Sequence, residues 1–517
     1  MKILSHKQKI LDYLWLLLLT AAALLVQGYH PFVEDSEIYL PGVEKILHPE
    51  LFPVGGEFFR AHASLTFFPN VIAFSLRLTH LPMEVGLFLW QVASIFLLLL
   101  ACWELSRLFF SRARAQWGAV CLVAVLLTIP VSGTALYIMD QYLNPRNLAA
   151  FAGIFILVRT LEKKYVQALL WLVFAACMHP LMWVFPFSFC LLFVVMDRFE
   201  GGWRALGATR LAALLLLPIP LALAPSSAYH EAAKGHPYHY IQNWAWYELL
   251  GIVAPLVLFW WFGRIARRRE WRMVERVSRA CMLCGLIYLV GAVLVDLPAR
   301  FEALARLQPL RSLHFLYIVM FVMMGGFFGE CVLQNRVWRW LLLFAPLSLG
   351  MFMAQRALFP ASAHLEWPGA APRNPWAQAF VWIRQNTPVS AVFALDPYYM
   401  DIAGEDEIGF RCLAERSRLA DGVKDNGVVS MFPPLAEEWW SQVEAQTPWK
   451  NFRSGDFSRL QEKYGVSWVV VEAPSVSGLD CVYGNGSVRV CRLPYPAEIE
   501  NLERDNEDKK DRKVEKK

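Results

Sequence analysis

ILDYLWLLLLTAAALLVQ, residues 10–27, is the first of many apolar runs in this chain, and GYHPFVEDSE, residues 28–37, follows it directly. The first segment is long enough to cross a bilayer as a helix. The second brings two adjacent carboxylates, Glu34 and Asp35, to the end of that helix. Charged side chains are costly inside hydrocarbon, so we expect the pair in a loop or a wet cavity at the membrane surface.

The apolar character extends over most of the chain. Of the 517 residues, 56% are hydrophobic and 18% are charged, and the mean hydropathy is +0.37. This composition predicts an α-helical polytopic membrane protein with about eleven transmembrane helices. No Walker loop, GxGxxG–helix unit or HExxH motif is present, so the sequence indicates neither a nucleotide-driven machine nor a zinc protease. We also expect no nucleic-acid partner. The expected spans lie near residues 10–28, 84–105, 116–133, 147–161, 166–179, 181–196, 208–225, 247–263, 279–296, 312–331 and 338–354.

The distribution of basic residues predicts the orientation in the membrane. Alternate connections between spans are rich in Arg and Lys, most of all residues 264–279, and the intervening connections are poor in them. Because positive residues are retained on the cytoplasmic side, this asymmetry predicts a cytoplasmic N-terminus and an external C-terminus. The alternation holds only if residues 66–81 form an interfacial helix that does not cross the membrane.

Beyond residue 356 the chain turns polar. We expect a linker over 357–373, a small soluble α/β domain over 374–497 and a disordered charged tail over 498–517. The domain should contain helices near 375–385, 434–446 and 455–464 and strands near 391–395 and 466–471, and Asn374-Pro375 should cap the first of these helices. Asn485-Gly486 predicts a hairpin, and Cys481 and Cys491 flank it closely enough to permit a disulfide. Charged residues of the domain fit either a carbohydrate-binding surface or, more simply, a salt-bridged solvated face: Asp396, Arg411, Arg416, Asp421 and Lys424.

Unusual polar residues gather in the connections that are predicted to be external. They form the set of candidate site residues together with Glu34 and Asp35, and they come from most of the external connections. The members of this set are Arg60, His62, Asp140, Arg146, His179, His236, His239, Arg300, Gln308 and Arg311.

Each candidate also has a simpler explanation. Glu34–Asp35 fits a solvated loop, and His179 before a proline fits a helix cap. His236 and His239 fit an aromatic interface belt better than a zinc site, because zinc needs a fuller ligand set. A metal site is therefore not assigned, and a divalent cation stays open. Arg311 fits an anion site, since guanidinium suits phosphate, or an arginine that reaches lipid headgroups.

Taken together, the acidic pair after the first span, the long first external loop over 29–83 and the late arginines resemble the GT-C superfamily of polytopic glycosyltransferases. Those enzymes use polyprenyl-phosphate-linked sugars as donors. Glu34-Asp35 matches the position of the family's acidic motif, and Arg311 lies where such enzymes often keep a basic group. The segments Trp382–Pro388 and Phe410–Asp421 look like those of uncharacterised bacterial GT-C-like membrane proteins.

The resemblance implies sugar transfer from a lipid-linked donor to a lipid, glycan or protein acceptor at the periplasmic face of the inner membrane. Asp35 or Glu34 would act as the base, with Asp35 preferred because its shorter side chain is held more rigidly. Arg311, with Arg300 and Gln308, would bind the donor phosphate. The remaining candidate residues would contact substrate.

Two other functions fit the same sequence. A transporter or flippase would need charged residues near the centres of the spans, whereas here they cluster at the ends. A non-catalytic scaffold for envelope polysaccharide assembly would use the external domain to bind partners.

Overall fold

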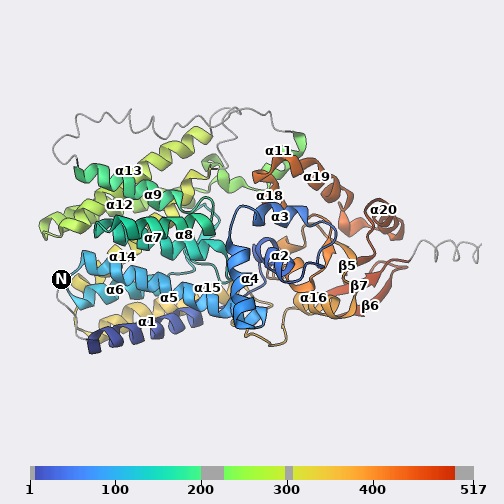
Figure 1. Cartoon of the computed structure of the whole chain (residues 1–517), viewed down its shortest axis with the longest axis horizontal. Helices are drawn as coiled ribbons and strands as arrows, with labels where there is room; N and C mark the ends of the chain where they lie inside the picture. Colours follow the sequence, from blue (N-terminus) through green and yellow to red (C-terminus); the bar gives the residue numbers. More distant parts are fainter. Residues whose placement is uncertain (1–5, 199–225, 297–306, 495–517) are drawn as a thin grey trace, which may run out of the picture.

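The computed structural model describes residues 6–198, 226–296 and 307–494 of the chain. The molecule is elongated: a bundle of long helices forms one end, and a body of shorter helices and a sheet forms the other (Figure 1). The helices of the bundle follow the long axis of the molecule. The predicted seventh span at 208–225, Arg300 and the predicted charged tail lie outside the described residues.

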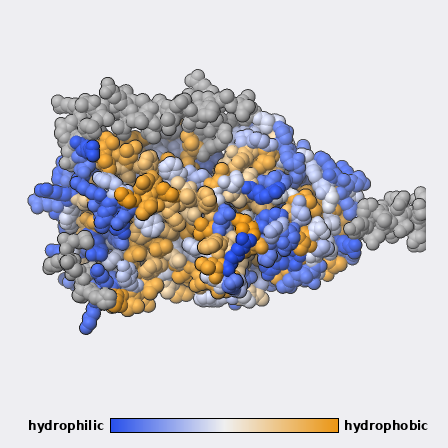
Figure 2. Space-filling model, in the orientation of Figure 1, coloured by the Kyte–Doolittle hydropathy of each residue, from blue (hydrophilic) through white to orange (hydrophobic). Residues whose placement is uncertain are grey.

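A helix is present at each of the ten other predicted spans. Among the described residues, six apolar helical segments are long enough to cross a membrane: Lys7–Gln27, Met83–Phe109, Trp246–Arg268, Arg272–Val295, Pro309–Leu333 and Val337–Leu358. Figure 2 shows hydrophobic residues over the helical part of the surface and hydrophilic residues at both ends of this face. These apolar helices are compatible with a membrane protein, while a total of eleven crossings stays a prediction. The helices are α1 (His6–Gln27), α5 (Met83–Phe109), α6 (Ala113–Val125), α7 (Pro145–Leu161), α8 (Tyr165–Met178), α9 (Val184–Arg198), α12 (Trp246–Arg268), α13 (Arg272–Val295), α14 (Ser312–Phe327) and α15 (Val337–Leu358).

Helix α7 lies at the centre of the bundle, with nearly every residue buried. Helix α14 is also buried along its whole length and crosses α6 at very short range. A Cβ added to Gly325 of α14 would collide with the backbone of Gly118 and Ala119 in α6. In contrast, α15 exposes a row of large apolar side chains that includes Leu341 and Leu342. Such a face is typical of a helix that contacts lipid.

Three helices fill the long connection between α1 and α5: α2 (Ser36–Leu47), α3 (Glu57–Ala63) and α4 (Phe68–Thr79). Helix α4 confirms the helix predicted within 66–81, and it exposes Phe74 and Leu78 to two-thirds of their full extent. Its position at a membrane surface stays a prediction.

The C-terminal body is built on a five-stranded sheet in the order β4-β3-β5-β7-β6. Strands β4, β3 and β5 are parallel, whereas β7 and β6 pair antiparallel. The predicted hairpin is confirmed, and a disulfide joins Cys481 to Cys491 within it. The predicted cap is also present: Asn374 Oδ1 accepts the N–H groups of Trp376 and Ala377. The elements are α16 (Pro375–Asn386), β3 (Val392–Leu395), α17 (Arg411–Ala414), β4 (Ser417–Arg418), α18 (Asp425–Met431), α19 (Ala436–Ala445), α20 (Ser454–Tyr464), β5 (Trp468–Glu472), β6 (Asp480–Gly484) and β7 (Val488–Arg492).

The C-terminal body is not a separate appendage. Helix α17 packs on α2, α18 packs on α3, and α11 (Ser227–Lys234) packs on α18 and α19. The predicted linker is also held in place, because the N–H of Glu366 donates to the carbonyl of Tyr29, the N–H of Tyr29 donates to the carbonyl of His364, and His30 Nδ1 lies 2.8 Å from Glu366 Oε1. The connection after α1 therefore belongs structurally to the C-terminal body.

Candidate functional site

The acidic pair lies where the helical bundle meets the C-terminal body. The chain leaves α1 at Gln27, and the N–H of Glu34 donates to the carbonyl of Glu407 at 2.9 Å. Glu34 adopts φ = 51°, a left-handed conformation that is uncommon for a residue with a side chain. Asp35 is the N-cap residue of α2. A segment nearly four hundred residues away in sequence thus fixes the backbone of the pair.

Asp35 is anchored by an arginine at the start of α7. Arg146 Nη1 donates to Asp35 Oδ2 at 2.7 Å, and Nη2 donates to Asp140 Oδ2 at 3.2 Å. Asn144, the N-cap of α7, donates to the same Asp140 oxygen at 2.6 Å. The hydroxyl of Tyr142 lies 3.4 Å from Arg146 Nη2. Three predicted site residues, Asp35, Asp140 and Arg146, therefore form one buried ion network.

The two carboxylates of the pair differ in basicity. Burial acts to raise the pKa of Asp35, but Arg146 and Lys424 outweigh it and hold that pKa well below its ordinary value. Burial also raises the pKa of Glu34, and here the opposing effect of Lys424 is too small, so the pKa rises to about 7. The nearby carboxylates of Glu407, Asp35 and Asp140 add to this increase.

Arg311 approaches the pair from the bundle. It ends a 3-10 turn, Pro309–Arg311, directly before α14, and its guanidinium lies over the ring of Tyr238 at 5.9 Å from the centroid. Its positive charge helps to lower the pKa of Asp35. Its Nε is buried without a hydrogen-bond partner, and among the described residues no carboxylate lies within ion-pair distance of it. Gln308 accepts the N–H of Arg311 through its carbonyl, and its own side-chain oxygen is buried and unpartnered.

The predicted histidines 236 and 239 lie on the same side as Arg311. Their rings are 5.3 Å apart, and the hydroxyl of Tyr238 is 3.1 Å from His236 Nδ1. Burial lowers the pKa of His236 to about 4 and that of His239 to about 2, so both are neutral at pH 7. Their Nε2 atoms are buried without partners. No group of three or more His, Cys, Asp or Glu with the spacing of a metal site occurs in the described parts of the chain.

Three further candidates have more local roles. His62 packs edge-on against Tyr39 at 4.8 Å, and burial lowers its pKa to about 4. His179 Nδ1 accepts the N–H groups of Leu181 and Met182, which agrees with the predicted capping role. Arg60 is exposed on α3, and its guanidinium donates to the carbonyl of Gly56 at 3.2 Å. Arg60 therefore contacts its own helix and not the acidic pair.

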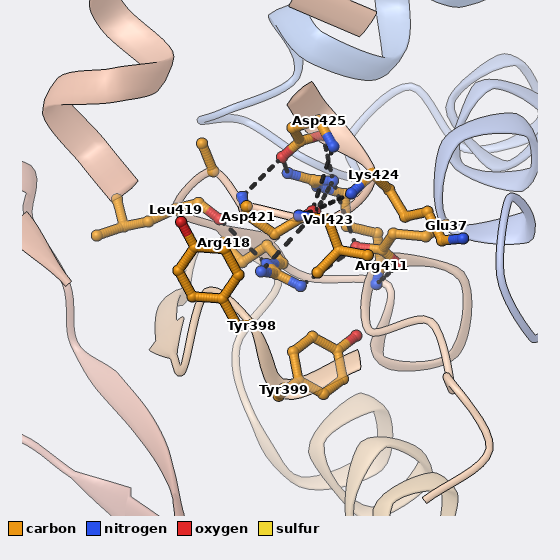
Figure 3. A network of polar contacts seen from close by, with 12 residues as sticks. Glu37, Tyr398, Tyr399, Arg411, Arg418, Leu419, Asp421, Val423, Lys424 and Asp425 are labelled. Atoms are coloured by element: carbon orange, nitrogen blue, oxygen red, sulfur yellow. Dashed lines mark hydrogen bonds and ion pairs between the residues drawn. The ribbon is translucent and has the colours of Figure 1, made fainter. Parts of the chain in front are cut away.

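A second charge cluster lies beside the pair and is completely buried (Figure 3). Arg411 donates to both carboxylate oxygens of Asp425, at 3.0 and 2.7 Å, and its backbone N–H donates to Glu37 Oε2 at 2.7 Å. Arg418 lies 3.6 Å from Glu37 and 3.9 Å from Asp421. The charged residues of this region were predicted to form a solvated face or a carbohydrate surface. That prediction is wrong, because Arg411, Asp421 and also Arg416 are buried.

The sequence analysis did not assign two residues, Lys424 and Glu407, to the site. Lys424 was assigned to the solvated face, yet its ammonium lies 3.4 Å from Glu34 Oε2. Glu407 was not considered, although its carboxylate lies 3.5 Å from the same ammonium. The Asp-Gly pair at 421–422 signals a turn before Lys424, but no local signal connects that turn with a loop almost four hundred residues earlier.

The site thus combines a pair of carboxylates of unequal basicity, two flanking cations and a half-buried arginine, Arg311, that has no ion pair with a described carboxylate. Such an arrangement is suited to removing a proton from one group while stabilising negative charge on another. No protein-family model matches this chain, and no curated protein has a matching sequence.

Proposed function

We propose that this protein is a membrane glycosyltransferase of the GT-C type, which transfers a sugar from a polyprenyl-phosphate donor to an acceptor hydroxyl. The observation that carries the proposal is Arg311, a half-buried arginine near Asp35 whose Nε is buried without a hydrogen-bond partner and which makes no ion pair with a described carboxylate. A buried N–H group without an acceptor is unfavourable, so this position suits a negatively charged ligand. A phosphate group matches the planar donor set of arginine.

Glu34 is the better base of the two carboxylates. A general base works best when its pKa lies near the working pH, and the pKa of Glu34 is about 7. The acceptor hydroxyl would lose its proton to Glu34 as its oxygen attacks the anomeric carbon. The bond from that carbon to the phosphate oxygen would break in the same step, with inversion, and Arg311 would stabilise the departing phosphate.

Asp35 takes the second role in this scheme. Its salt bridge to Arg146 keeps it ionised, which makes it a weak base but a rigid acceptor for a substrate hydroxyl or a divalent cation. This assignment differs from the expectation based on side-chain length alone, which favoured Asp35 as the base. His236, His239 and Tyr238 would line the side of the site on which the donor binds.

The proposed setting is the inner membrane of a bacterial cell, with the N-terminus in the cytoplasm and the site on the periplasmic side. The basic residues support this orientation, since they gather at the other end of the bundle, for example at Arg112, Arg114 and residues 264–279. The charged residues of the site lie at helix ends and not at helix centres, which favours an enzyme over a transporter.

The test is sugar transfer in membrane vesicles from a panel of polyprenyl-phosphate sugars. We expect Glu34→Gln to lower the rate at least about 100-fold, as for loss of a general base. Asp35→Asn should also impair transfer, whereas the matched control Glu50→Gln, at an exposed position, should not. Transfer at the normal rate by both site variants would remove the pair from catalysis. No transfer by the unmodified protein from any donor would favour a scaffold or a transporter.

A further inference from the structure

Lys424 belongs to the C-terminal body, but its side chain ends among carboxylates of other segments. Its ammonium lies 3.4 Å from Glu34 Oε2, 3.7 Å from Asp35 Oδ1 and 3.5 Å from Glu407 Oε2. Only 12% of the side chain is exposed. Within residues 6–198, 226–296 and 307–494, no other cation lies within ion-pair distance of Glu34.

The turn that carries Lys424 is firmly built (Figure 3). Asp421 Oδ1 accepts the N–H groups of Val423, Lys424 and Asp425 at 2.8, 2.5 and 3.2 Å. Asp425 in turn accepts the N–H of Asp421 at 3.0 Å. A single carboxylate that accepts three successive backbone donors fixes the direction in which the Lys424 side chain leaves the turn.

The same turn is joined a second time to the segment that carries the acidic pair. Arg411 bridges Asp425 to Glu37, and all three side chains are almost fully buried. Residues 34–37 and 421–425 are therefore tied by two layers of charge: Lys424 with Glu34 and Asp35, and Arg411 with Glu37 and Asp425. The contacts of Arg411 hold the two segments together, and they thereby set the distance between Lys424 and the acidic pair.

Charge balance indicates what Lys424 contributes. The site holds four carboxylates, those of Glu34, Asp35, Asp140 and Glu407, while Arg146 pairs with Asp35 and Asp140 alone. Without Lys424, Glu34 and Glu407 would lie side by side with no cation between them. Like charges in such a position disfavour ionisation, so one carboxylate would take up a proton or the two would move apart.

Building on the proposed transferase function, we propose that Lys424 is the positioning residue of this site, which holds Glu34 next to Asp35 as a carboxylate. The C-terminal body is thereby part of the active site and not an accessory binding module. The site is incomplete without that body.

The first experiment is a pH profile of sugar transfer for Lys424→Met, Lys424→Arg and the exposed control Lys450→Met. The titratable groups around Glu34 are Lys424, Glu407, Asp35, Asp140, Tyr137 and Tyr142. Removing the cation should move the acidic limb of the profile up by about one pH unit, because an opposite charge at this distance lowers the pKa of an acid by roughly that amount or more. The arginine variant should restore the limb, and the control should leave it unchanged.

Glu407→Gln should shift the acidic limb of the pH profile in the opposite direction, and loss of folding would not produce such a shift. This variant removes a like charge from the neighbourhood of Glu34, so its acidic limb should move down. An unchanged limb in both Lys424→Met and Glu407→Gln, in protein that elutes as a single species, would overturn the role of Lys424.

A second experiment does not depend on activity. A carbodiimide joins an amine to a carboxylate only when the two are in contact, so it should link Lys424 to Glu34, Asp35 or Glu407 in the purified full-length protein. Mass spectrometry would locate the link, and Lys424→Arg would abolish it. Absence of the link in the unmodified protein overturns the Lys424 proposal. The link in a protein that transfers no sugar from any donor overturns the transferase and keeps Lys424 as the residue that positions the pair.

Discussion

Glu34 and Asp35 are neighbours in the chain, but their carboxylates have different cationic partners. Asp35 pairs with an arginine from the bundle, whereas the one described cation within ion-pair distance of Glu34 is Lys424, which Glu34 shares with Asp35 and Glu407. Environments that drive two adjacent pKa values apart allow one group to act as base while the other stays ionised. The residue types of this site were predictable, because charged groups beside a span are conspicuous. Their roles were not, since Arg146 and Lys424 are remote in sequence from the pair.

At this scale, Arg146 should matter for stability as well as for transfer. Its side chain is 9% exposed and compensates two carboxylates, so Arg146→Met would leave Asp140 without its cation and Asp35 with Lys424 alone. Breaking a buried pair in this way costs about 3–5 kcal/mol. We expect a clearly lower midpoint in thermal unfolding followed by tryptophan fluorescence in detergent.

The control is Arg112→Met, which alters an ion pair with a 63% exposed arginine. Its effect should stay below about 1 kcal/mol, because the exposed arginine contributes little and Arg114 still pairs with the buried carboxylate of Glu330. Equal midpoints for the two variants would show that the Arg146 network adds nothing to stability.

At the scale of elements, local signals predicted what local interactions determine. The Asn374 cap, the Asn485-Gly486 hairpin and the apolar runs each appear as expected. Helices α2 and α3 were predicted only as parts of a long external loop, because their packing partners lie in α17 and α18. The close crossing of α6 and α14 was not anticipated, since its glycines stand two hundred residues apart.

The close crossing of α6 and α14 yields a prediction, and a glycine in another helix of the bundle provides the control. Gly325→Ala places a methyl group against the backbone of α6, and overpacking of this kind costs about 1–3 kcal/mol. Gly350 in α15 has no atom within 4 Å of the added carbon. Gly350→Ala should therefore leave the thermal midpoint unchanged or raise it slightly, since alanine favours a helix by about 1 kcal/mol. A harmless Gly325→Ala would mean that α6 and α14 do not touch at this point.

At the scale of the whole molecule, the chain was predictable as a helical membrane domain followed by an α/β region. The boundary between them was not, because the buried Arg411–Glu37 contact joins residues that fall on opposite sides of it. The amino-acid composition changes sharply at residue 357, but composition indicates only which surfaces are exposed to solvent. Which surfaces meet each other is decided by ion pairs between segments that are far apart in sequence.

The basic connections predict the orientation of the whole chain, and fusions can test this prediction. A phosphatase that needs the periplasm should be active when fused after residue 494 and inactive when fused within 264–279. A cytoplasmic fluorescent reporter should give the reverse pattern. The opposite result at residue 494 would mean that one more segment crosses, and 66–81 would be the first to examine.

The double tie between residues 34–37 and 421–425 also has a consequence for biosynthesis. The acidic pair is among the first parts of the chain to leave the ribosome, whereas Lys424 and Arg411 are among the last. Throughout that interval, residues 34–37 lack both of these counter-ions. The growing protein thus carries an incomplete charge network until residue 425 has been made, and a product truncated before that residue lacks the tie.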